Sequence, residues 1–124
     1  MILPAFKQGG YSYQTQVAVG QRLGGGRHVV DVLAEKNGQQ FLISLKWQQV
    51  GGTAEQKVPF EVISLIEAME AGTFVKAYVV LGGEGWTLRE FYTTIGLKRY
   101  IVGAERVEIL RLEAFVAKAN QGLL

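Results

Sequence analysis

The chain has 124 residues, 48% of them hydrophobic, and it contains no cysteine, which excludes disulfide bonds and thiolate metal sites and suits a reducing cytoplasm. A chain of this length can build one compact core, so we expect a single domain over residues 1–124. Thirteen Lys and Arg against eleven Asp and Glu give a net charge of +2, so bulk charge does not indicate nucleic-acid binding and any DNA contact has to come from local patches.

The N-terminal region is expected to contain one strand. Residues 1–10 are predicted to be irregular, because Pro4 and the Gly9-Gly10 pair disfavour regular structure. Their apolar stretch is too short for a signal peptide, and no run reaches the roughly 18 to 20 residues of a membrane span. We therefore expect a cytoplasmic protein without membrane contact. Residues 11–20 alternate like a strand, although Tyr13, Val17 and Ala18 could also line a helix, and their β-branched content favours the strand. Gly24 to Gly26 predict a turn after it.

A hairpin is predicted next. Residues 27–35 are rich in apolar residues and read as a strand, and Asn37-Gly38 is a strong turn signal that pairs it antiparallel with a strand over 40–47. In the register that this turn sets, residues whose numbers sum to about 75 face each other. Asp31, the only aspartate in the chain, is then opposite Ser44.

The second strand of this hairpin carries a lysine at the end of an apolar run, where a charged side chain needs a partner or a function. Alternation along the run predicts two faces, one with Leu42, Ser44 and Lys46 and the other with Ile43, Leu45 and Trp47. Asp31, Ser44 and Lys46 are therefore expected to converge on one polar patch.

A helix is predicted after this strand. Thr53 to Gln56 fits a capping box, and apolar residues recur at helical spacing as far as Gly72. Pro59 is early enough to kink the helix without abolishing it. The remaining predicted elements are a central strand over 74–81, a loop over 82–85, a short helix over 86–94, a strand over 107–110 and a helix over 112–120.

This order of elements predicts an α/β fold with a mixed sheet of about five strands flanked by helices. At the residue level the sequence resembles the PD-(D/E)XK nuclease superfamily, which has the restriction-endonuclease-like fold. The resemblance rests on Val30-Asp31-Val32, on Ser44-Leu45-Lys46 and on the stretch 52–57 that opens the helix, and it covers roughly residues 27–81.

The resemblance implies hydrolysis of DNA phosphodiesters with Mg²⁺, for which Mn²⁺ can substitute. It implies that Asp31 ligates the metal, that the main-chain carbonyl of Leu45 helps, and that Lys46 serves the attacking water. Ser44 stands where the superfamily usually has Asp or Glu. Some restriction enzymes of the superfamily share this serine and take the carboxylate from the next helix, which nominates Glu55 first and Glu61 second.

Each candidate also has a structural explanation. Glu55 and Glu61 are six residues apart, about 240° around a helix, so both do not easily face one metal. Glu55 also suits the helix dipole near an N-terminus, and Lys46 could extend from the core to water. Gln48 could contact a phosphate or a base edge, or be an exposed residue without a role. His28, the only histidine, is expected to be structural or a distant DNA contact rather than a catalytic base.

The preferred hypothesis is a Mg²⁺-dependent DNA endonuclease. A chain this short has no separate recognition domain, so specific cleavage would require a homodimer or a partner recognition subunit. One rival hypothesis is a catalytically inactive relative that kept the fold as a DNA-binding or protein-assembly module, which Ser44 favours. Another is a small α/β protein with an unrelated binding role. DNA structure and sequence preference are not encoded in any motif of the chain.

Overall fold

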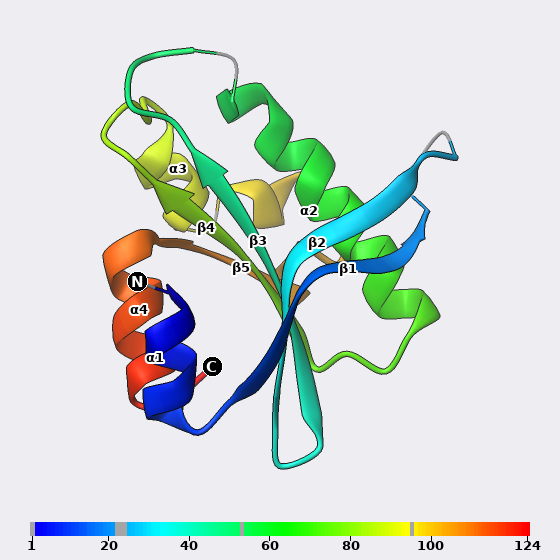
Figure 1. Cartoon of the computed structure of the whole chain (residues 1–124). Helices are drawn as coiled ribbons and strands as arrows, with labels where there is room; N and C mark the ends of the chain where they lie inside the picture. Colours follow the sequence, from blue (N-terminus) through cyan, green and yellow to red (C-terminus); the bar gives the residue numbers. More distant parts are fainter. Residues whose placement is uncertain (1, 22–24, 53, 95) are drawn as a thin grey trace.

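The computed structural model describes residues 2–21, 25–52, 54–94 and 96–124, which form a mixed β-sheet with helices on both faces (Figure 1). The sheet has five strands in the order β1-β2-β3-β4-β5: β1 (Ser12–Gln21), β2 (Arg27–Lys36), β3 (Gln39–Trp47), β4 (Lys76–Gly82) and β5 (Val107–Arg111). The first three strands are antiparallel, and β4 and β5 run parallel to β3. The helices are α1 (Ile2–Gly9), α2 (Ala54–Ala71), α3 (Arg89–Thr93) and α4 (Leu112–Asn120), with short 3-10 turns η1 (Leu97–Arg99) and η2 (Ala104–Arg106). The predicted α/β fold is confirmed.

Two apolar cores lie on opposite faces of the sheet. Leu42 of β3 belongs to the core beneath α2, whereas Ile43 belongs to the core beneath α1 and α4. The predicted alternation along β3 is therefore confirmed, and Ser44, with the same parity as Leu42, is buried on the α2 side. Among the described helices, none is both long and apolar enough to span a membrane.

The N-terminal residues form a helix, so the predicted irregular lead-in is wrong. Pro4 lies in the first turn of α1, where a missing N–H costs nothing. Ala5 and Phe6 are buried against the α4 side, and Gly9 lets the helix approach the Ala119 carbonyl so closely that a Cβ atom would not fit. The Gly9-Gly10 pair ends the helix and does not prevent it from forming. Gly10 has φ +87°, the left-handed conformation in which many helices end.

The hairpin between β2 and β3 has the predicted register. Val32 pairs with Ile43, and the other partners also sum to 75. The ladder ends at this pair, and beyond it β2 and β3 diverge (Figure 1). Val30 faces the α2 core, whereas Val32, two residues later, faces the opposite core. The alternation of side chains along β2 is therefore interrupted at Asp31. Asp31 therefore lies where the two strands separate.

Helix α2 runs from Ala54 to Ala71 without a break at Pro59. Pro59 has no N–H to give to the carbonyl of Glu55, and the hydroxyl of Tyr92 donates to that carbonyl at 2.7 Å instead. The segment before α3 is not helical, so the helix predicted over 86–94 is shorter than expected. The predicted turn at 24–26 and the capping box at Thr53 fall partly outside the described residues.

Candidate active site

A cluster of polar side chains lies between β3 and α2. Lys46 Nζ is 3.7 Å from Glu61 Oε1, and His28 Nε2 is 3.1 Å from Glu61 Oε2. Ser44 also hydrogen-bonds to Glu61. Glu61 is only 3% exposed, whereas Lys46 is 23% exposed and lies toward solvent. The structure thus brings Ser44, Lys46 and Glu61 together and adds His28, which β2 places on the same side of the sheet.

The carboxylate of Glu61 is ionised at neutral pH. Burial raises its pKa, but the hydrogen bond from His28, the charge of Lys46 and the hydrogen bond from Ser44 together bring the pKa below its ordinary value. Because an ionised carboxylate only accepts hydrogen bonds, His28 donates from Nε2. Its Nδ1 is buried and has no hydrogen-bond partner in the described part of the chain. His28 holds one oxygen of Glu61 while Lys46 faces the other.

Asp31 lies beside β3 and contacts its main chain. The N–H of Leu45 donates to Asp31 Oδ2 at 2.6 Å, at the point where the ladder between β2 and β3 has ended. In an extended strand the N–H and the C=O of one residue point to the same side, so the carbonyl of Leu45 is also directed toward the gap between the strands. Asp31 and the Leu45 carbonyl therefore offer oxygen atoms to the same gap.

Glu55 has a different set of contacts. Its carboxylate accepts hydrogen bonds from the Thr87 hydroxyl at 2.7 Å, from the Leu88 N–H at 3.0 Å and from the Thr87 N–H. These bonds lower the pKa of Glu55 and outweigh the opposing effect of burial. With its carbonyl bonded to Tyr92, Glu55 anchors the segment 87–92 to the start of α2.

Gln48 positions the loop that follows β4. Its side chain is buried and donates from Nε2 to the Gly85 carbonyl at 2.8 Å. Its main-chain N–H donates to Gly82 at 3.0 Å, and its carbonyl accepts from the Gly85 N–H at 2.8 Å. These contacts give Gln48 a structural function in the loop over 82–85.

The oxygen atoms at the β2–β3 gap and those between β3 and α2 are of the type that hard divalent cations prefer. The described residues contain no group of three or more His, Cys, Asp or Glu side chains placed to hold a metal ion. Mg²⁺ does not require such a group, because it commonly binds through one or two carboxylates and keeps several waters. Asp31, the Leu45 carbonyl and Glu61 are all oxygen donors, so their chemistry fits Mg²⁺.

Comparison with known proteins identifies the family. A family model described as a PD-(D/E)XK nuclease superfamily domain matches residues 1–123. The chain belongs to the PD-(D/E)XK nuclease superfamily. The search of curated proteins gave no match.

A solved structure supports the same fold for this superfamily member. The crystal structure of the protein of unknown function AF1548 matches with a TM-score of 0.57 and 16% sequence identity, over 90% of this chain and 54% of that chain. The chain therefore spans about half the length of that protein, and a likeness at this identity shows the fold alone.

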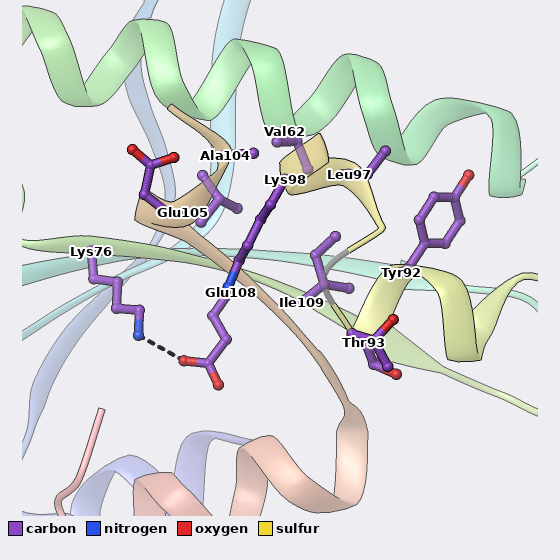
Figure 2. Close-up of a pocket in the computed structure, with 12 residues that line it drawn as sticks. Val62, Lys76, Tyr92, Thr93, Leu97, Lys98, Ala104, Glu105, Glu108 and Ile109 are labelled. Atoms are coloured by element: carbon purple, nitrogen blue, oxygen red, sulfur yellow. Dashed lines mark hydrogen bonds and ion pairs between the residues drawn. The ribbon is translucent and has the colours of Figure 1, made fainter. Parts of the chain in front are cut away.

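A cavity of about 240 Å³ lies away from the superfamily motifs, between α2, α3 and β5 (Figure 2). Its lining includes none of Asp31, Ser44, Lys46, Glu55 and Glu61. At its rim, Figure 2 shows the amine of Lys76 bonded to the carboxylate of Glu108 at 2.7 Å. Lys118 approaches the same oxygen at 3.3 Å. These ion pairs stabilise the start of β4 against β5.

The Glu108 cluster predicts a pH dependence of stability. Partial burial raises the pKa of Glu108, but Lys76 and Lys118 bring it below its ordinary value of 4.5. A lower pKa in the folded state means that this stabilisation is present above the unfolded pKa and is lost as pH falls through the folded one. We expect Glu108→Gln to lower the free energy of unfolding at neutral pH and to flatten its decrease below about pH 4.5, measured by urea denaturation at several pH values.

A matched control is available in α4. Glu113 is 73% exposed and 3.9 Å from Arg111, so Glu113→Gln should leave the pH dependence unchanged. Equal pH dependence in Glu108→Gln and the wild type would contradict the assignment.

Sequence reasoning treated His28 only as structural or as a distant contact. Alternation along β2 does carry a signal, because His28 and Val30 are two residues apart and both face the α2 core. The pairing with Glu61, which is 33 residues away along the chain, follows only from the packing of α2 on the sheet.

Proposed function

We propose that the chain is a Mg²⁺-dependent nuclease that hydrolyses DNA phosphodiester bonds, with Asp31, the Leu45 carbonyl and Glu61 holding the metal. The observation that carries the proposal is the position of Glu61. The Glu61 carboxylate from α2 contacts Ser44 and lies 3.7 Å from Lys46, a position from which it would replace the acidic side chain that the superfamily usually has at residue 44. Glu61 is the better candidate than Glu55, whose carboxylate is occupied by Thr87 and Leu88.

The chain's own groups have distinct functions in this proposal. Ser44 is small enough for Glu61 to approach β3, and His28 holds Glu61 in its orientation. The Lys46 ammonium is partly exposed, so it can orient the attacking water and stabilise the negative charge that develops on the phosphate. Bound Mg²⁺ supplies phosphate polarisation and a lower water pKa. Asp31 is held by the Leu45 N–H, which fixes the direction of its second oxygen.

Cleavage assays with purified protein test the proposal. We expect supercoiled and linear DNA to be nicked or cut with Mg²⁺ or Mn²⁺, and the activity to disappear when a chelator is added in excess, because the phosphate then loses its charge stabilisation. Heating and refolding the sample, followed by a second assay, separates this activity from a contaminating nuclease of different stability. Equal cutting in excess chelator would overturn the proposal.

The second candidate function is an inactive nuclease-fold module that binds DNA or assists protein assembly. It is favoured by the absence of a three-member metal cluster among the described residues. Calorimetric titration of Mn²⁺ distinguishes the two, because an inactive module should show no saturable site that depends on Asp31. For the active nuclease, we propose that target recognition comes from a homodimer or a partner subunit.

A further inference from the structure

Strands β1 and β2 change faces of the sheet at the same point. Tyr13 of β1 packs on the core beneath α1 and α4, whereas Val17 packs on the core beneath α2. Tyr13 pairs with Ala34 of β2, which lies in the same core as Tyr13. Val17 pairs with Val30, which lies in the core of Val17. Residues 13 and 17 would share one face of a regular strand, so the alternation is broken between them.

Gln16 is the irregular residue at this point of β1. Its backbone is left-handed, with φ +53°, and among the described residues the other non-glycine residue with positive φ is Asn37 in the hairpin turn. The pairs on either side of Gln16 have the same register, so Gln16 lies opposite Asp31 and no residue is inserted in either strand. A residue outside the extended conformation breaks the alternation of a strand, and the left-handed Gln16 therefore coincides with the change of face.

Strand β3 does not take part in this change. Leu42 and Ile43 alternate between the two cores without interruption. Beyond Gln16, β2 stays paired with β1 but no longer with β3, and Figure 1 shows β1 and β2 curving away from β3 together. The gap in which Asp31 accepts from the Leu45 N–H therefore opens where β1 and β2 change faces and β3 does not.

We propose that Gln16 is a positioning residue for the metal site, because its left-handed backbone turns β1 and β2 away from β3 and so directs Asp31 into the gap. The inference rests on the proposed nuclease function, in which Asp31 is a metal ligand. A left-handed conformation is unfavourable for a residue with a Cβ atom, and such outliers occur where a protein holds a functional group in place. With an extended Gln16, the hairpin register would continue and pair Asp31 with Ser44.

Two substitutions of Gln16 separate its backbone from its side chain. Gln16→Gly and Gln16→Val both remove the amide, but glycine adopts a left-handed conformation readily and the β-branched valine does not. The first measurement is a calorimetric titration of Mn²⁺. We expect Gln16→Gly to keep the wild-type affinity and Gln16→Val to weaken it by about 10- to 100-fold, the range found for residues that orient a metal ligand.

The second measurement needs no metal. The Leu45 amide proton, which is bonded to Asp31 at 2.6 Å, should resonate far downfield in an NMR spectrum, and Asp31→Ala gives its position without that bond. We expect Gln16→Val to move the resonance toward its Asp31→Ala position and Gln16→Gly to leave it in place. The same spectrum shows whether each variant is folded. If the valine variant does not fold, Gln16→Ala replaces it and should shift the resonance less than valine but more than glycine.

Gln14→Val is the matched control, because Gln14 is exposed on the same strand and is not among the residues with positive φ. It should change neither the Mn²⁺ affinity nor the Leu45 resonance. Equal behaviour of the glycine and valine variants of Gln16, whether both change or neither does, would overturn the positioning proposal. Failure of the nuclease function has a different signature, namely a wild-type protein that binds no Mn²⁺ and cuts no DNA while its Leu45 resonance is still far downfield.

Discussion

Replacing Lys46 with alanine is expected to lower the rate of DNA cleavage by about 10²- to 10⁴-fold without unfolding the protein. The Lys46 amine lies 3.7 Å from Glu61 and is partly exposed, so a phosphate that approaches this cluster from solvent can contact it. Asp31→Ala should produce a similar loss for another reason, because it removes an oxygen donor and leaves the Leu45 N–H without its acceptor. Single-turnover cleavage at saturating Mg²⁺ measures both effects on the chemical step.

Lys57 provides the matched control for the lysine variant. It lies on α2 and is exposed, so Lys57→Ala removes the same charge from the chain outside the Lys46–Glu61 cluster. We expect its cleavage rate to remain within about threefold of the wild type, because exposed charges are screened by solvent and salt. If Lys46→Ala cut DNA as fast as Lys57→Ala, Lys46 would have no part in the reaction.

The second large effect is expected for Glu61→Gln, which should weaken Mg²⁺ binding by at least about tenfold and lower the cleavage rate with it. The amide has the shape of the carboxylate and can still accept from His28, so the packing of α2 is retained while the negative charge is lost. Calorimetric titration of Mg²⁺ gives the affinity, and a thermal melt confirms that the variant is folded.

Glu55→Gln is the informative comparison, because the same change is made six residues earlier on the same helix. We expect it to leave Mg²⁺ affinity unchanged and to lower the melting temperature, since the amide cannot accept from Thr87 and Leu88 as the carboxylate does. The reverse result, with metal affinity lost in Glu55→Gln and retained in Glu61→Gln, would show that Glu55 supplies the missing carboxylate.

Features that depend on local sequence were predictable. The Asn37-Gly38 turn sets the hairpin register, and the register places Asp31 next to the end of the β2–β3 ladder. The alternation along β3 separated Ser44 from Leu45 correctly, and the terminal helix α4 has the predicted bounds, Leu112–Asn120. Turn residues and the spacing of hydrophobic residues along the chain are sufficient to predict these features.

Features that depend on tertiary contacts were not predictable. Whether Glu55 or Glu61 faces β3 is decided by the rotation of α2 on the sheet and by the segment 87–88, which lies 32 residues beyond Glu55 and binds its carboxylate. The helix α1 forms because Phe6 can pack against Phe115 near the other end of the chain, with ring centroids 5.9 Å apart. No local pattern around residues 1–10 encodes that contact.

The bond between the Tyr92 hydroxyl and the Glu55 carbonyl has a consequence for local unfolding. Pro59 leaves that carbonyl without its usual donor within α2, and the donor instead comes from a segment 37 residues away in sequence. The first turns of α2 and the segment that leads into α3 complete each other's hydrogen bonding, so neither can fray without exposing polar groups of the other. The two therefore open as one cooperative unit, and amide hydrogens in both should exchange with solvent at a common rate.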